Sequence, residues 1–243
     1  MTSRPFLVVA LVLALVTAGC LGGVQAQSEP TDSDTTSPSI GVTATAEVAA
    51  DPDLAVVSVA VEATADTADA ARGQVADGTD SVRAALDAAG IPADAVRTTT
   101  FAVQPRYDYR GDTPELVGYR ATHALAVDVT DIDRAGEIVD VAVGNGATRV
   151  DGVQFTLQDA TRDALRSQAL TDAMTAARAD ADTVAAAGSL TVTGVDHAAT
   201  SQQTSVSPGP VFERAASDSG TSFSPGPVTV TATVSVTYAA SAN

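Results

Sequence analysis

The stretch that decides the fold is the alanine-rich segment 159–188, DATRDALRSQALTDAMTAARADADTVAAAG. Its apolar residues recur at steps of three and four, which predicts a helix about 40 Å long with one apolar face. Asp159 or Thr161 can cap its start, and Gly188 suits a left-handed position after its end. Because the apolar face is mostly alanine, we expect a sheet or a neighbouring subunit to approach the helix backbone closely. That face comprises Leu165, Ala169, Leu170, Ala173, Ala177, Ala181 and Val184.

Upstream of this helix, strands and helices alternate. Helical spacing predicts one helix from Asp66 or Thr67 to Ala89 and a second after a capping box at 130–133. The short turn at 51–53 predicts that the two strands it joins form an antiparallel hairpin, and the next two strands form another. Alternating apolar residues place these strands at 40–48, 54–64, 96–107, 117–129 and 149–157.

Downstream of the helix, 190–197 predicts a short strand, and 228–238 predicts a last strand with valine on one face and hydroxyls on the other. Between them, 200–227 is low in complexity and contains Ser-Pro-Gly-Pro twice, which predicts a mobile, solvent-exposed excursion. The order ββαββαβαββ predicts an α+β fold in which helices pack on antiparallel or mixed sheets.

The N-terminus has the features of an export signal. Arg4 precedes an apolar run over 6–16, which is too short to cross a membrane but fits a signal peptide. Residues 17–20, Thr-Ala-Gly-Cys, resemble a lipobox, so a lipid is expected on Cys20, with an uncleaved anchor as the alternative. We therefore divide the chain into a signal peptide with lipobox (1–20), a flexible linker (21–39) and one domain (40–239), on the outer face of the cell membrane.

The charge balance excludes several functions. The chain has 30 acidic and 13 basic residues, a net charge of −17, and no lysine. We interpret this acidity as a halophilic adaptation, and it argues against binding of nucleic acid, which needs a basic surface. Without lysine, neither Schiff-base chemistry nor a P-loop is possible.

Few residues suggest catalysis or metal binding. His123 lies on the apolar face of a strand, where a hydrogen-bonded core histidine is expected, and His197 is expected at the surface. Cys20 is the only cysteine, so the domain has neither a disulfide nor a cysteine nucleophile. Pairs of aspartates at 51/53, 131/133 and 180/182 are explained by capping or solvation. No cofactor, metal site or hydrolase triad is predicted, and no Gly-x-Ser-x-Gly occurs.

One group of residues is a candidate contact surface. Aromatic and arginine side chains alternate around the turn between strands 96–107 and 117–129. They form either cross-strand packing, with arginines covering aromatic faces, or a contact site for a ligand or a subunit. The group comprises Arg106, Tyr107, Tyr109, Tyr119 and Arg120.

Several short motifs follow one another along the chain: Pro52-Asp53, AALDAAGI at 84–91, QPRYDY at 104–109, VGYRA at 117–121 and VDGVQF at 150–155. In this order they resemble the SIMPL-domain family, which includes YggE-like and periplasmic immunogenic proteins. The resemblance implies an exported α+β domain that self-associates into rings and has no established catalytic centre, with some members linked to stress responses. It implies no functional residue.

Together these observations predict a non-enzymatic, lipid-anchored, cell-surface protein that self-assembles as a scaffold or a stress-related envelope factor. The expected partners are the membrane, through Cys20, and further copies of the chain, while any other protein partner stays open. The alternative is a surface lipoprotein that binds a small molecule. An extracellular hydrolase is a third hypothesis, although no recognisable nucleophile–histidine–acid arrangement supports it.

Overall fold

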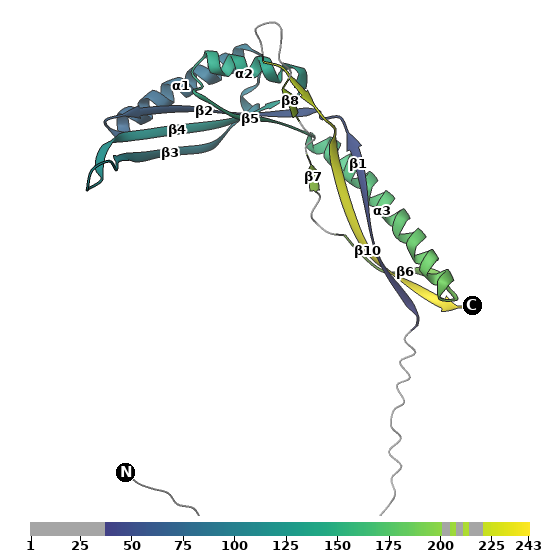
Figure 1. Cartoon of the computed structure of the whole chain (residues 1–243). Helices are drawn as coiled ribbons and strands as arrows, with labels where there is room; N and C mark the ends of the chain where they lie inside the picture. Colours follow the sequence, from purple (N-terminus) through teal and green to yellow (C-terminus); the bar gives the residue numbers. More distant parts are fainter. Residues whose placement is uncertain (1–36, 201–204, 208–210, 214–220) are drawn as a thin grey trace, which may run out of the picture. The chain divides into compact units, whose positions relative to one another are not determined.

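A computed structural model describes residues 37–200, 205–207, 211–213 and 221–243 (Figure 1). The predicted signal peptide, the lipobox and most of the linker lie outside the described residues. The helices are α1 (Ala68–Ala88), α2 (Ala135–Gly144) and α3 (Asp159–Ala187). The strands are β1 (Ser39–Ala50), β2 (Leu54–Ala65), β3 (Val96–Asp108), β4 (Glu115–Val129), β5 (Arg149–Thr156), β6 (Leu190–Thr200), β7 (Ser205–Ser207), β8 (Val211–Glu213), β9 (Phe223–Pro225) and β10 (Val228–Ala242).

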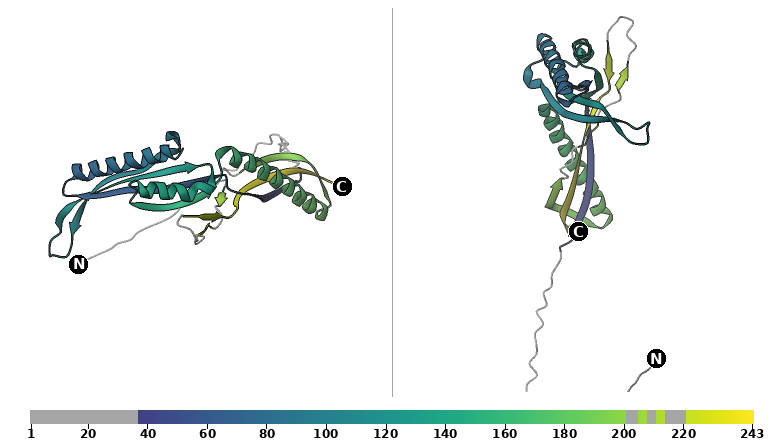
Figure 2. Two further views of the ribbon diagram at one scale, coloured as in Figure 1. Left: turned by 90° about the horizontal axis from the view of Figure 1, so that it is seen from above. Right: turned by 90° about the vertical axis from the view of Figure 1, so that its left-hand side faces the viewer.

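The strands form two main antiparallel sheets, which confirms the α+β class. Sheet A has the order β1-β10-β6, with β7 also pairing with β10. Sheet B has the order β3-β4-β2-β5, and β8 and β9 form a separate small pair. Figures 1 and 2 show α1 and α2 on one face of sheet B, and α3 along sheet A.

The prediction that the turn at 51–53 joins an antiparallel hairpin is wrong. β1 pairs along its whole length with β10, whereas β2 lies in sheet B between β4 and β5. The turn therefore carries the chain from one sheet to the other. The hairpin of β3 and β4 is confirmed.

The core of sheet A is built from alanine against valine. Alanines at every fourth position of α3 are at most 2% exposed and pack on the apolar face of β1 and β10. Of the two partners expected for the alanine face, a sheet or a neighbouring subunit, the sheet is the one that packs on it. Val184 is 52% exposed and does not belong to that face. The buried stripe keeps a strict four-residue step, which places Ala185 inside instead. Its members are Ala169, Ala173, Ala177, Ala181 and Ala185.

The core of sheet B contains the larger side chains. Leu86 of α1, Ile138 of α2 and Phe155 of β5 are almost fully buried between the helices and the sheet. The opposite face of sheet B is not covered by any helix that the structure describes. Each sheet therefore has one face packed on helix and one open face.

The helix ends agree only in part with the expected caps. Thr67 caps α1, because its hydroxyl accepts a hydrogen bond from the amide of Ala70 at 3.2 Å. Gly188 is not left-handed: its φ is −90°, and the next residue, Ser189, takes a φ of 57°. The expected capping box at 130–133 is also absent, since a 3-10 turn starts there and Asp131 makes no capping hydrogen bond.

The end of the excursion predicted to be solvent-exposed is packed instead. Asp140 of α2 accepts hydrogen bonds from the amide of Thr221 at 3.1 Å and from its hydroxyl at 2.8 Å. Phe223 packs against Phe155, with ring centroids 6.0 Å apart. This docking requires glycine at 136, because a Cβ there would lie 1.7 Å from the carbonyl oxygen of Thr221.

The two connections between the sheets meet at Asp53. One oxygen of its carboxylate accepts a hydrogen bond from the amide of Gln158 at 2.6 Å, and the other accepts one from the Thr161 hydroxyl at 2.5 Å. The side-chain amide of Gln158 in turn donates to the Asp53 carbonyl at 3.1 Å. The start of α3 is therefore capped by a residue 105 positions earlier, and not by Asp159 or Thr161.

We predict that Asp53→Ala lowers the free energy of unfolding by about 1–3 kcal/mol, because it removes the acceptor of the Gln158 amide and of the Thr161 hydroxyl. Chemical denaturation of both proteins measures the difference. Asp51→Ala is the control, since Asp51 is an exposed neighbour in the same turn. Equal stability of the Asp53 variant and the wild type would contradict this assignment.

We also predict that Gly136→Ala undocks residues 221–225, because the added methyl group overlaps the Thr221 carbonyl. Amide hydrogen exchange at Thr221 and Phe223 should become faster. Gly144→Ala is the matched control on the same helix, since a Cβ at Gly144 meets nothing within 4 Å. Unchanged exchange in the Gly136 variant would show that the docking does not depend on this close approach.

Candidate functional site

The candidate contact surface lies at the end of the β3–β4 hairpin, where the structure separates its members. Tyr119 and Arg120 are neighbours in β4, so their side chains point to opposite faces of sheet B. Tyr119 is half-buried against the helix-covered core, whereas Arg120 is exposed on the open face. The predicted group is therefore not one cluster.

Several exposed apolar side chains lie at the turn itself. Tyr107, Tyr109, Leu116 and Val117 are 44%, 72%, 47% and 47% exposed, and we call these four residues the hairpin tip patch. The rings of Tyr107 and Tyr109 are 6.2 Å apart between centroids. The ladder shifts register beside Tyr107, and Gly118 adopts a φ of 128° where the end of β2 approaches. A Cβ at Gly118 would lie 2.8 Å from the Ala65 carbonyl oxygen.

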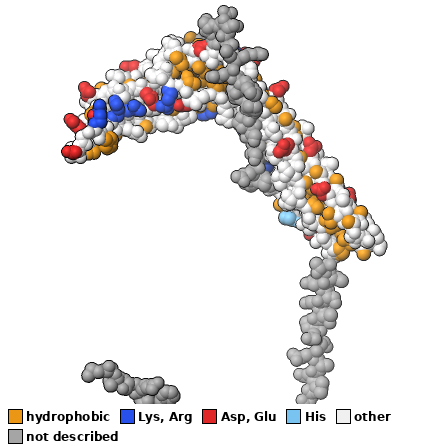
Figure 3. Space-filling model, viewed as in Figure 1, with side chains coloured by type: hydrophobic (Ala, Val, Ile, Leu, Met, Phe, Trp, Pro, Cys, Tyr) orange, Lys and Arg blue, Asp and Glu red, His pale blue; other side chains and the backbone are white. Residues whose placement is uncertain are grey.

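Arginines line the open face of sheet B. Figure 3 shows the basic side chains gathered over this part of the molecule. Arg97 pairs with Asp128, and Arg149 pairs with Glu62 and Asp151. The hydrogen bonds that Arg149 donates to the Asp151 carboxylate raise the pKa of Arg149. Sequence reasoning missed Arg97 and Arg149 as members of this face, although strand alternation could have indicated them.

Arg106 and Arg120 differ from these two arginines. Neither takes part in the ion pairs found among the described residues. Arg120 borders a shallow hollow of about 260 Å³ that also includes Glu62 and Thr148. The Thr148 hydroxyl accepts a hydrogen bond from the Glu62 amide at 2.8 Å, and the Glu62 carboxylate pairs with Arg149, so these two residues already have partners within the protein.

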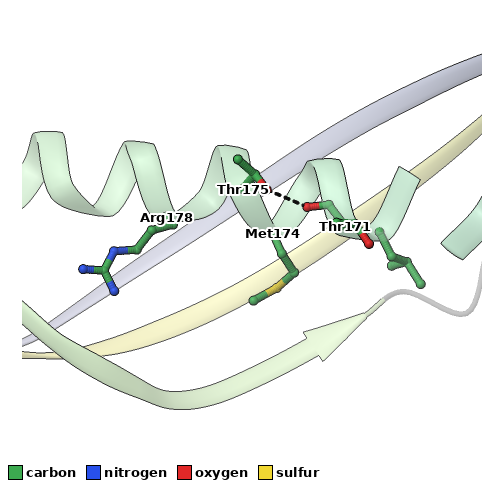
Figure 4. A pocket seen from close by; sticks show the side chains of 5 residues that line it. Thr171, Met174, Thr175 and Arg178 are labelled. Atoms are coloured by element: carbon green, nitrogen blue, oxygen red, sulfur yellow. Dashed lines mark hydrogen bonds between the residues drawn. The ribbon is translucent and has the colours of Figure 1, made fainter. Parts of the chain in front are cut away.

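A larger groove of about 540 Å³ runs along α3 (Figure 4). Its lining is mostly apolar and includes Met174. The hydroxyls of Thr171 and Thr175 donate to backbone carbonyls one turn earlier, at 3.0 and 2.9 Å. Arg178 pairs with Asp182 and lies 5.7 Å from the ring centre of Tyr238. The donors of both threonine hydroxyls and the Nε–H of Arg178 are therefore already used within the protein.

His123 is hydrogen-bonded as expected but only half-buried, and His197 lies at the surface as expected. Nε2 of His123 lies 2.8 Å from the Thr98 hydroxyl, and its ring meets Phe101 edge-on at 5.5 Å. Burial lowers the pKa of His123, and the positive charge of Arg83 adds to this effect. His197 is exposed on β6, in a shallow hollow with the hydroxyls of Thr43 and Thr237.

Within the part of the chain that the structure describes, no three histidine, cysteine or acidic side chains are grouped as metal ligands would be. Asp53 bonds to the start of α3 and Asp182 pairs with Arg178, whereas Asp131 makes no capping hydrogen bond. Among the same residues, no helix combines the length and apolarity that a bilayer crossing requires.

The His123 environment predicts a pH dependence of stability. Because its pKa is lowered in the folded state, the unfolded chain binds more protons below the ordinary value of 6.5, and stability falls as the pH decreases through that value. Denaturation curves at about pH 7.5 and about pH 5.5 should show this loss. His123→Gln should reduce it, and His197→Gln should leave it unchanged. Equal pH dependence in the wild type and His123→Gln would contradict the assignment.

The comparisons with known proteins agree with the motifs. The profile of the SIMPL family, described as a protein of unknown function (DUF541), matches residues 40–238. The uncharacterized protein YggE of Escherichia coli K12 is 27% identical over 165 residues, which cover 67% of this chain and 66% of that protein. YggE of Edwardsiella ictaluri is 27% identical over 173 residues, or 70% of each chain. Since the family match covers both sheets and all three helices, this chain belongs to the SIMPL family.

Proposed function

We propose that this chain is a non-enzymatic, lipid-anchored protein of the outer cell surface that self-assembles through its SIMPL domain. In this proposal it acts as a scaffold or a stress-related factor of the envelope. The signal peptide and lipobox expected from residues 1–20 support export and attachment through Cys20. The excess of acidic residues supports a halophilic setting, in which salt screens the charge of −17 on each copy.

The observation that carries the proposal is the hairpin tip patch. Two of the four tyrosines of the chain lie there, together with an exposed leucine and an exposed valine. Exposed apolar side chains such as the neighbouring rings of Tyr107 and Tyr109 are typical of contacts between proteins, and tyrosine is enriched in such contacts. By contrast, the hollows that we describe offer no convergent, unpaired polar groups of the kind that catalysis needs.

The test is the mass of the full chain, extracted in detergent and measured by light scattering in about 1 M salt. We expect a defined oligomer. The double variant Tyr107→Ser, Tyr109→Ser should shift to a smaller mass, because it removes the apolar part of the contact. Val195→Ser is the control, since Val195 is 53% exposed but lies on β6.

A monomeric wild type would overturn the self-assembly proposal. It would favour the alternative, a surface lipoprotein that binds a small molecule. The feature that supports this alternative is the hollow beside Arg120, whose guanidinium is outside the ion pairs of the described residues and suits an acidic ligand.

A further inference from the structure

We propose that the free edge of β1 pairs antiparallel with β1 of a second copy of this chain, about a twofold axis, so that two copies of sheet A become one sheet. This inference rests on the proposed self-assembly, but it concerns a different surface from the hairpin tip patch. The partner is a second copy because the edge is complementary to its own sequence.

The first observation is that β1 is a long terminal strand. It forms twelve consecutive pairs with β10, from Ser39 to Ala50, without a register shift. On its other side, none of the strands that the structure describes pairs with it. Figure 1 shows β1 at the margin of sheet A.

The second observation is which backbone groups the free edge presents. The Pro38 carbonyl accepts a hydrogen bond from the Ala240 amide at 2.8 Å, which fixes the phase of the ladder. Because antiparallel bonding alternates along a strand, even-numbered residues bond to β10 and odd-numbered residues direct their N–H and C=O groups outward. The outward residues are Ser39, Gly41, Thr43, Thr45, Glu47 and Ala49, and all six have an amide proton.

The third observation is that the other strands at sheet margins have irregularities that oppose pairing with another chain, whereas β1 has none. β3 contains Pro105 and two register shifts, and β5 has a register shift beside Gly152, whose φ is 145°. β6 also has two register shifts against β10. Such irregularities are the usual means of preventing edge-to-edge pairing. β1 has no proline, no register shift and a single charged residue, Glu47.

The alternation of apolar and hydroxyl residues in β1 also suits pairing with β1 of a second copy. β10 fits β1 because both strands alternate apolar residues toward α3 with hydroxyl residues on the open face. Thr43 pairs with Ser235 at 3.1 Å and Thr45 with Thr233 at 2.9 Å between side-chain oxygens. A second β1 has the same alternation, so its threonines would extend this row of hydroxyls.

Symmetry and charge favour the same arrangement. A twofold axis normal to the sheet keeps the open faces of both copies on one side, so each α3 continues to cover its own sheet. Glu47 is the only charged residue on this edge. It lies opposite Glu47 of the second copy only if the twofold axis passes through residue 47. Because each chain carries −17, pairing should strengthen as salt rises and screens the repulsion.

Cysteine cross-linking of the full chain tests the pairing directly. Cys20→Ser removes the only thiol, and cysteines are then placed at residues 41, 43, 45 and 47, one at a time and as mixtures of two variants. Directly opposed residues of this kind lie about 5.5 Å apart between Cα atoms, within reach of a disulfide. We expect dimers only where the two residue numbers add to one constant sum. A constant difference would indicate parallel pairing and, like the absence of dimers, would overturn the proposal.

A proline variant tests the backbone bonds. Thr45→Pro removes one outward N–H without removing a bond to β10, whereas the control Thr45→Val loses the same hydroxyl and keeps the amide. We expect the proline variant to lose cross-linking between the remaining positions and the valine variant to keep it. Should Thr45→Pro fail to fold, Gly41→Pro with Gly41→Ala serves instead, since a Cβ at Gly41 meets nothing within 4 Å. Cross-linking that survives in the folded proline variant would overturn the proposal.

The light-scattering measurement separates this inference from the proposed function. An oligomer that does not cross-link through β1 would overturn only the β1 contact. A monomer would overturn both.

Discussion

The structure depends on the carboxylate of Asp53, which joins the two places where the chain passes between its sheets. The turn from β1 to β2 and the connection from β5 to α3 are 105 residues apart, and both of their backbones are held by this residue. The position of α3 follows from it, because the amide and hydroxyl at the start of the helix have Asp53 as their acceptor. Since α3 is the helix that covers sheet A, the packing of that sheet's core depends on Asp53 in the turn.

The alanine stripe explains why the position of α3 matters so much. Ala173, Ala177 and Ala181 have no rotamers with which to fill a gap, so the helix must lie close to the sheet to exclude water. Small side chains also bury little apolar area each, so sheet A relies on many regular contacts and not on a few large ones. The unbroken β1–β10 ladder is consistent with this requirement, because each register shift would interrupt the row that faces the alanines.

Local periodicity predicted the three α-helices, the longer strands and the hydroxyl face of β10, because those features follow from spacing within one segment. It did not predict the three-residue strands β7, β8 and β9. It could not predict that β1 pairs with β10 and not with β2, since partner choice depends on the whole fold. The left-handed Ser189 and the docking of Thr221 onto Asp140 were equally hidden, because nearby residues do not determine either. Strand alternation does predict that Tyr119 and Arg120 lie on opposite faces, so grouping them by their closeness along the chain was wrong.

The distribution of charge connects the fold to assembly. β1 and β10 together contain one charged residue, Glu47, in a chain of net charge −17. The acidic residues concentrate elsewhere, for example at Asp172 and Asp180 on the exposed side of α3. A surface that stays in water has no physical need to be free of charge, and charge there would improve solubility. In the β1 pairing that we propose, charges on the edge strand would lie close to like charges of the second copy and would oppose the contact. A strand with the single charge of Glu47 therefore suits the proposed contact better than an acidic strand would.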